Sequence, residues 1–253
     1  MSDRPDPWER LRQLTPARIG LGRTGDALPT RALLDFQLAH ARARDAVRAE
    51  LDVPRLRREL ATALPDWPSV AVSSCAADRD LYLQRPDLGG KLHPEDAGEL
   101  RAGAFDAVFI LADGLSATAV HAHALAVLAG VASRLGSLAL APLVIARQAR
   151  VALGDPIGAA LGARLSVILI GERPGLSSPD SLGAYLTFAP QAGRTDAERN
   201  CISNIRRGGL PPGAAAERLA GLVLDSLRLR ISGVALKDRS EPTLVGETPP
   251  TLE

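Results

Sequence analysis

A carboxylate and a guanidinium, Glu172 and Arg173, stand where an apolar segment of the sequence ends. The residues before them, Leu165–Ile170, are apolar or small with β-branched members, which is typical of a strand covered on both faces. Pro174 disfavours a helix at Arg173, so both charged side chains are expected at the carboxyl end of this strand. Open α/β sheets bind ligands at that edge. Glu172 is therefore a candidate hydrogen-bond acceptor for a ligand; alternatively, it pairs with a nearby arginine.

Two further candidates come from single residues in turns or polar segments. Cys201 stands in Asn200–Asn204, and a lone cysteine is most often a small buried apolar residue. A nucleophilic thiol needs a positioned base, and no histidine lies near Cys201 in the sequence. Val151 follows the turn Arg147–Arg150 and offers only van der Waals contact or its backbone carbonyl. These residue types alone assign no role to either position.

One glycine motif matches a dinucleotide-binding fingerprint but lacks its context. Gly20–Gly25 satisfies G-x-G-x-x-G, which requires a strand directly before it and a helix that starts within it. Pro16 leaves only residues 17–19 for a strand, and Pro29 delays the next helix. We therefore interpret this segment as a turn-rich loop and not as a nicotinamide site.

No catalytic serine or protein-held metal is predicted. The segment Asp113–Ser116 follows a strand but lacks the G-x-S-x-G frame, so Asp113 is expected to cap the following helix or to lie at the sheet edge. His121 and His123 are two residues apart and would face different sides of a helix. The other histidines, His40 and His93, are scattered along the chain.

Strand and helix patterns alternate along most of the sequence. Strands are predicted at 70–74, 106–112, 138–146 and 165–170. Helices are predicted at 31–51, 54–65, 78–84, 116–135, 155–163 and 212–231. This alternation predicts an α/β fold with a Rossmann-like parallel sheet and a small helical N-terminal domain. The expected division is a helical domain at 1–66, the α/β domain at 67–238 and a disordered, proline-rich tail at 239–253.

The composition narrows the class of protein. The 253 residues include 30 basic and 29 acidic side chains, a balance that gives no attraction towards nucleic acid or an anionic membrane. No apolar run approaches the roughly 20 residues of a transmembrane helix, and the first residues lack the apolar core of a signal peptide. Cys75 and Cys201 are the only cysteines and have no C-x-x-C spacing. We expect a soluble, intracellular protein without a disulfide framework.

Six strings of the sequence carry a resemblance, and several of them are long and irregular: DPWERLRQLTPARIGLGRTG (6–25), YLQRPDLGGKL (82–92), ADGLS (112–116), GERPGLSSPDSLGAYLTFAP (171–190), RTDAERNCISNIRRGG (194–209) and SGVALKD (232–238). Together they resemble the small (light) subunit family of ethanolamine ammonia-lyase. The resemblance extends over nearly the whole chain, from about Asp6 to Asp238.

The resemblance implies adenosylcobalamin as cofactor and three residues that contact it. Glu172 stands at the glutamate of the family's GERPG motif, where a carboxylate can accept hydrogen bonds from the amide side chains around the corrin ring. Val151 matches the valine of R-V-x-x-x-D-x-I-G, and Cys201 matches the cysteine of the NCISN segment, as a backbone or side-chain contact. No histidine stands in an Asp-x-His-x-x-Gly motif, so the cobalamin is expected to keep its own dimethylbenzimidazole on cobalt.

The resemblance also implies a partner and a reaction. The family's large subunit is a TIM barrel that carries the substrate pocket and most catalytic groups, and the two subunits form a hetero-dodecamer. The complex converts ethanolamine to acetaldehyde and ammonia by a radical mechanism, and we assign no catalytic residue to this chain. The alternative is a stand-alone cobalamin carrier or a Rossmann-type enzyme. Members targeted to bacterial microcompartments often carry an N-terminal extension; only a few residues precede Pro7 here, so a cytoplasmic enzyme is expected.

Overall fold

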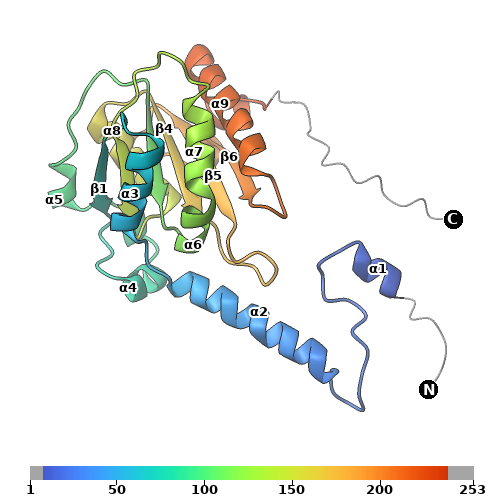
Figure 1. The fold of residues 1–253 in the computed structure, drawn as a ribbon. Helices are drawn as coiled ribbons and strands as arrows, with labels where there is room; N and C mark the ends of the chain where they lie inside the picture. Colours follow the sequence, from blue (N-terminus) through green and yellow to red (C-terminus); the bar gives the residue numbers. More distant parts are fainter. Residues whose placement is uncertain (1–7, 239–253) are drawn as a thin grey trace.

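The computed structural model describes residues 8–238 and shows a mixed α/β fold around one six-stranded sheet (Figure 1). The strand order is β1-β3-β2-β4-β5-β6. The strands are β1 Ser69–Ser73, β2 Ala107–Ala112, β3 Leu143–Arg147, β4 Leu165–Gly171, β5 Leu182–Phe188 and β6 Arg199–Ile205. The predicted disordered tail, 239–253, lies outside the described residues.

The four predicted strands are confirmed, and they form the parallel part of the sheet. β1, β3, β2 and β4 pair side by side in parallel. The third strand begins at Leu143 and not at Leu138, because Pro142 has no backbone N–H to donate to a neighbouring strand. β5 and β6, which the sequence pattern did not predict, add two antiparallel strands beside β4. The sheet is therefore mostly, but not wholly, parallel.

The described helices are α1 Glu9–Gln13, α2 Thr30–Arg48, α3 Val53–Ala63, α4 Arg79–Gln84, α5 Pro94–Ala97, α6 Ala117–Ala119, α7 Leu125–Ala132, α8 Gly154–Leu161 and α9 Pro212–Leu229. The predicted helix over 116–135 is present but contains a π-helical turn, Val120–Ala124, between α6 and α7. Such turns are frequent at functional sites.

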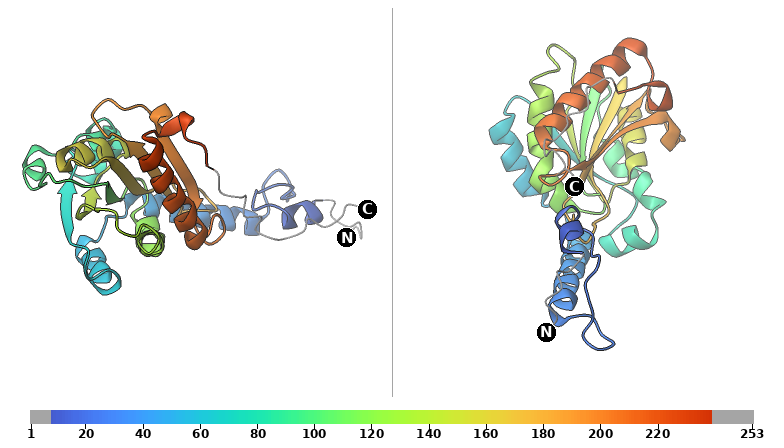
Figure 2. Two further views of the ribbon diagram at one scale, coloured as in Figure 1. Left: turned by 90° about the horizontal axis from the view of Figure 1, so that it is seen from above. Right: turned by 90° about the vertical axis from the view of Figure 1, so that its right-hand side faces the viewer.

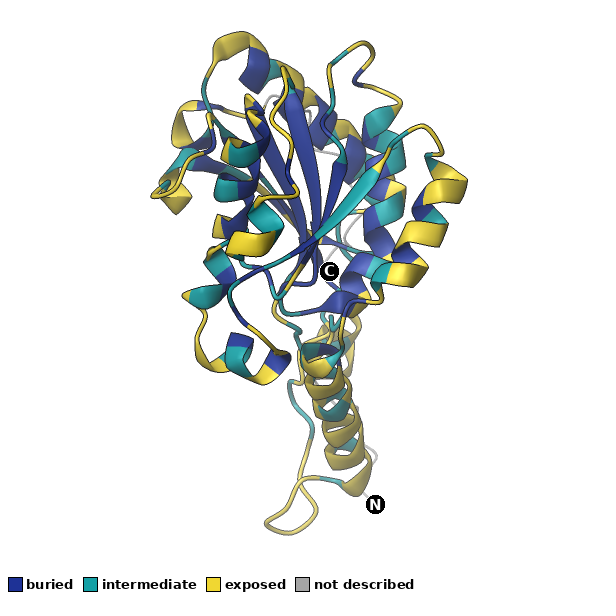
Figure 3. Cartoon of the chain, turned by 90° about the vertical axis from the view of Figure 1, so that its left-hand side faces the viewer, coloured by how far each residue is buried: buried dark blue, intermediate teal, exposed yellow. Residues whose placement is uncertain are grey.

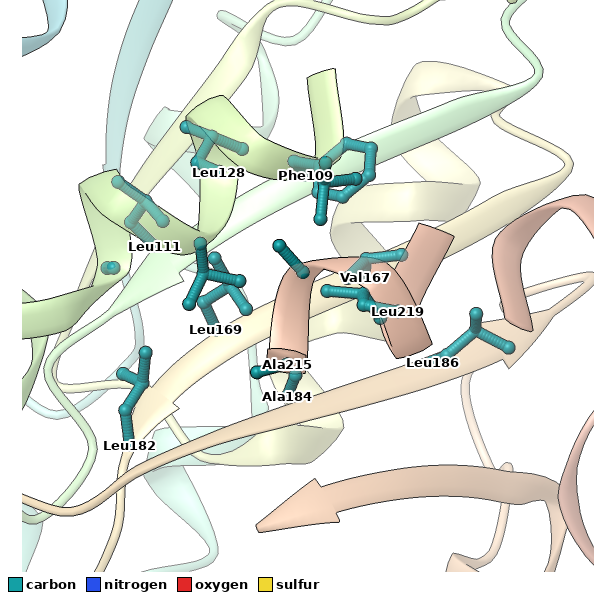
Figure 4. Close-up of a cluster of buried hydrophobic side chains, with 14 of the residues drawn as sticks. Phe109, Leu111, Leu128, Val167, Leu169, Leu182, Ala184, Leu186, Ala215 and Leu219 are labelled. Atoms are coloured by element: carbon teal, nitrogen blue, oxygen red, sulfur yellow. The ribbon is translucent and has the colours of Figure 1, made fainter. Parts of the chain in front are cut away.

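Alternating side chains of the central strands fill two apolar layers. Phe109 and Leu111 of β2 face the layer beneath α3, α7 and α9, where they meet Leu128 and Leu219 (Figure 4). The residues between them belong to the opposite layer, beneath α8. Successive side chains of a strand point to opposite faces of the sheet, and both faces of β2 are buried. The sequence of β2 is therefore apolar without interruption. Both faces of the central sheet are covered, so ligands can approach it only at its edges.

The N-terminal segment forms an arm. α2 projects from the α/β body, and α1 lies alongside its far end (Figures 1 and 2). Most of α2 is exposed (Figure 3), including the apolar side chains of Leu34 and Phe36. In contrast, Leu56 and Leu60 of α3 are buried in the core beside the sheet. The division into domains near residue 66 stays a prediction. Within the described part of the chain, no helix combines the length and the apolar character that a membrane span needs.

Candidate functional site

A cavity of about 350 Å³ opens at the carboxyl ends of β2, β3 and β4. Its walls include the predicted residues Val151 and Glu172, which are thus brought together, and also Tyr82, Arg150 and Tyr185. The chain leaves β2 towards α6 and α7 on one face of the sheet, whereas it leaves β3 towards α8 on the other face. Neighbouring strands whose connections diverge in this way leave a crevice at their carboxyl ends, and α/β proteins bind ligands there.

Glu172 presents its carboxylate from the first position after β4. Its Oε2 accepts hydrogen bonds from the Ser181 hydroxyl and from the Asn204 backbone N–H, the latter at 3.2 Å. The alternative expectation was that Glu172 pairs with a nearby arginine. Within residues 8–238 no such ion pair is found. A carboxylate has about four lone-pair positions. Among residues 8–238 no group donates a hydrogen bond to Oε1, so this oxygen is a free acceptor on a side chain that lines the cavity.

The loop after Glu172 is fixed at three points. The Glu172 backbone N–H donates to the Ser181 carbonyl at 2.9 Å, which closes the base of the loop. The Ser116 hydroxyl donates to the Pro179 carbonyl at 2.8 Å. The ring of His123, in the π-helical turn, lies 3.2 Å from a carboxylate oxygen of Asp180. These roles of Ser116 and His123 could not be predicted from the sequence, because the contacts join segments about 60 residues apart.

Asp113 organises the neighbouring loop. Its side chain is buried and accepts the backbone N–H groups of Gln148 and Ala149 at 2.8 and 2.9 Å, so it holds the segment that leads from β3 to Val151. Burial raises the pKa of Asp113, whereas these two hydrogen bonds and nearby Arg79 oppose that rise. The helix cap that was one expectation for Asp113 is instead supplied by Ser116, whose hydroxyl accepts the N–H of Ala119.

Cys201 lies on β6 next to this cavity but does not line it. It pairs across the sheet with Tyr185 of β5, whose side chain does line the cavity. Cys201 is exposed, unlike the buried position expected for a lone cysteine. Partial burial of its sulfur nevertheless raises the pKa of the thiol more than the hydrogen bond with Tyr185 lowers it, and nearby Glu172 raises it further. A thiol with a raised pKa is a poor nucleophile at neutral pH. The geometry therefore favours a contact role for Cys201.

The glycine motif lies outside this cavity, and the candidate metal-ligating side chains do not come together. Gly20–Gly25 belongs to the arm, where it follows no strand and borders a separate cavity of about 780 Å³ between α1 and α2. The residues that line this larger cavity all belong to segment 8–35, and α1 lies at the outer end of the arm, away from the sheet (Figure 2). Among residues 8–238, no group of three or more His, Cys, Asp or Glu side chains is placed to hold a metal ion.

Comparison with known proteins identifies the family. Residues 5–237 match the family model described as ethanolamine ammonia-lyase light chain (EutC). The chain is 52% identical over 247 residues to an ethanolamine ammonia-lyase small subunit of Pseudomonas fluorescens, with 94% of this chain and 89% of the relative covered. It is 53% identical to the small subunit of Azotobacter vinelandii (95% and 93% covered) and 55% identical to that of Bradyrhizobium diazoefficiens (92% and 91% covered). Because both the family model and these relatives match almost end to end, the chain belongs to the ethanolamine ammonia-lyase light-chain (small-subunit) family.

Proposed function

We propose that this chain supplies one part of an adenosylcobalamin site, which it shares with the large subunit of an ethanolamine ammonia-lyase. The observation that carries the proposal is the cavity at the ends of β2, β3 and β4, where Glu172 keeps a free carboxylate oxygen and Val151 forms part of the wall. Peripheral amides of a corrin ring offer N–H donors to such an oxygen.

The size of the cavity supports a shared site. About 350 Å³ lies near the lower limit for drug-sized ligands, and a corrinoid is much larger. The residues present therefore fit one edge of the cofactor, and the rest of the cofactor would be enclosed by a partner. A stand-alone carrier or a self-contained Rossmann-type enzyme would need a cavity that encloses its ligand, so this observation favours the subunit over those alternatives.

In this proposal, the role of this chain is to bind and orient the cofactor. When bound, adenosylcobalamin would supply the radical chemistry by which ethanolamine is converted to acetaldehyde and ammonia. Glu172 would accept hydrogen bonds from the edge of the cofactor, Val151 would contact it through apolar atoms or its carbonyl, and Cys201 would contact it beside Tyr185. The Asp113 and Ser116 hydrogen bonds hold the loops that carry Val151 and Glu172 in place.

Several finer features rest on the family resemblance and belong to the same proposal. They are the TIM-barrel fold of the large subunit, the hetero-dodecameric assembly and a cytoplasmic location. The Rossmann-like character of the sheet and the helical N-terminal domain at 1–66 are likewise proposed.

The direct test is acetaldehyde production from ethanolamine by the purified large subunit, titrated with adenosylcobalamin, with and without this chain. We expect activity only when both subunits are present. If the large subunit alone were equally active at the same cofactor concentrations, this chain would contribute no part of the site. An assembled but inactive complex that binds no cobalamin would favour a different function for this cavity.

A further inference from the structure

A second polar group, the guanidinium of Arg150, faces this cavity. Its carbon lies 4.7 Å from the centroid of the Tyr82 ring. Its Nε is buried and has no hydrogen-bond partner within the described residues, and no carboxylate in residues 8–238 forms an ion pair with it. A buried donor without a partner costs free energy, and native structures tolerate it mainly where a ligand or water completes the hydrogen bonding.

Several contacts hold Arg150 in this position. Its backbone N–H donates to the Gly89 carbonyl at 2.8 Å. Tyr82 is fully buried, and its hydroxyl donates to the Ala149 carbonyl at 2.8 Å, so the ring beneath the guanidinium cannot turn away. A Cβ at Gly89 would lie 2.8 Å from both the Arg150 Cγ and the Tyr82 ring. Tyr82 and Gly89, both in segment 82–92, thus pack against Arg150 and fix its position.

Arg150 and Glu172 line the same cavity without pairing with each other, and the exposed side chain of Arg173 lies at its rim. One offers N–H donors with a positive charge, and the other offers a free acceptor oxygen with a negative charge. A phosphate or carboxylate ligand would be repelled by Glu172, and an ammonium ligand would be repelled by Arg150. A neutral primary carboxamide suits both residues, because its carbonyl oxygen accepts hydrogen bonds and its NH₂ group donates them.

We propose that Arg150 and Glu172 together bind a primary carboxamide of the ligand, with Arg150 donating to the amide oxygen and Glu172 accepting from the amide N–H. This inference rests on the proposed cobalamin site, because the corrin ring carries such amides at its edge. Glu172 is then the residue that selects an intact amide over a carboxylate, Arg150 binds the amide oxygen, and Tyr82 is the positioning residue beneath Arg150.

The test measures binding of cyanocobalamin to the complex of this chain with its large subunit, by equilibrium dialysis and the absorbance of free cobalamin. We expect Arg150→Gln to raise Kd about tenfold or more, as for the loss of a hydrogen bond to a charged group. Arg150→Lys keeps the charge but loses the planar fork, so we expect a smaller rise. Arg147→Gln is the matched control, since this exposed guanidinium lies at the same sheet edge but outside the cavity.

A second measurement uses corrinoids in which one peripheral amide is hydrolysed to a carboxylate. For one positional isomer, wild type should bind more weakly because Glu172 repels the new charge, and Glu172→Gln should recover much of the loss. Arg150→Gln should weaken binding of that same isomer further, because it removes the attraction to the new carboxylate. An effect of the same size for all isomers and all variants would overturn the carboxamide assignment.

The possible failures can be told apart. If an assembled wild-type complex binds no cyanocobalamin, the proposed cobalamin site itself is wrong. If wild type binds it and a folded, assembled Arg150→Gln complex binds equally well, only the carboxamide inference is overturned. Circular dichroism and co-purification of the two subunits establish folding and assembly for each variant.

Discussion

Arg199 and Asp155 form a buried, bidentate ion pair. The two guanidinium nitrogens, Nη1 and Nη2, donate to the two carboxylate oxygens at 2.8 and 2.7 Å, and the side chains are only 3% and 2% exposed. The hydrogen bond with Asp155 is the largest cause that raises the pKa of Arg199. Asp155 is the second residue of α8, four residues after Val151, and Arg199 begins β6, two residues before Cys201. The ion pair therefore fixes two of the candidate contact segments relative to each other.

Asp155→Asn should destabilise the protein strongly. Removing the Asp155 charge leaves the buried guanidinium with the exposed carboxylate of Asp196, 3.6 Å from its Nε, as its remaining ion pair among residues 8–238. Loss of a buried partner costs about 3–5 kcal/mol in comparable buried pairs. Urea unfolding measures this change as a difference in the free energy of unfolding. Asp80→Asn is the control, because the pair between Asp80 and Arg48 is 70% and 65% exposed and should contribute less than about 1 kcal/mol. Equal decreases in the free energy of unfolding for the two variants would show that the buried pair stabilises the fold no more than the exposed pair.

Glu172→Ala should weaken apparent cobalamin affinity more than it lowers turnover at saturating cofactor. The reason is that Glu172 lies at the edge of the proposed site and is assigned no role in the reaction at the substrate. The affinity should fall about tenfold or more, as expected for the loss of a charged acceptor. The measurement is the dependence of acetaldehyde formation by the complex on adenosylcobalamin concentration. A stable, assembled variant with unchanged cofactor dependence would exclude Glu172 from the site.

Gly183→Ala should disturb the same carboxylate without changing any polar group. A Cβ at this position of β5 would lie 3.0 Å from the Glu172 Oε1 and 3.1 Å from the Tyr185 ring, so the Glu172 side chain would have to shift. We expect weaker cobalamin binding, measured by dialysis of the complex. Gly221→Ala is the control: this glycine lies exposed on α9 with open space around its Cα, and alanine there should stabilise the helix by about 0.5–1 kcal/mol without changing binding.

The sequence could predict the central strands and Glu172 because these rest on local patterns. β4 consists of apolar or small residues, and Glu172 follows it at the point where the pattern ends. β5 and β6 could not be predicted in the same way. β6 is a partly exposed edge strand with polar residues such as Asn200 and Ser203, and Gly183 interrupts the pattern of β5. Their strand structure depends on pairing with β4, which a local pattern does not contain.

The residues of the candidate site also fall into two groups, those that the sequence indicated and those that only the fold reveals. Sequence similarity to a family indicated Val151, Glu172 and Cys201, and the structure brings the first two into one cavity with the third alongside. Arg150 and Tyr82 were not predicted, because their importance comes from a ring contact and a missing hydrogen-bond partner. Both are properties of tertiary packing. The one local signal was the irregular string at 82–92, which had no chemical explanation before the fold was known.

Cys201→Ala should leave turnover at saturating cofactor largely intact. The raised pKa keeps the thiol protonated near neutral pH, so it cannot act as a thiolate nucleophile there. The same property predicts that iodoacetamide modifies Cys201 slowly at pH 7 and faster as the pH rises above 9, which mass spectrometry of the chain can follow. Abolished turnover in an assembled Cys201→Ala complex with normal cobalamin binding would contradict the contact role.

Glu198 should make the segment before β6 sensitive to acid. The pKa of Glu198 is lowered from 4.5 to about 2, first by the backbone N–H of Thr195 and then by the side chain of Arg194. A carboxylate whose pKa is lower in the folded state stabilises the fold above its unfolded pKa, and this contribution is lost as the pH falls from about 4.5 to about 2. Glu198→Gln lacks the titrating group, so the difference in Tm between wild type and variant should shrink over this range. A difference in Tm that is constant between pH 6 and pH 2 would show that the charge of Glu198 does not stabilise this segment, which leads directly into the strand that carries Cys201.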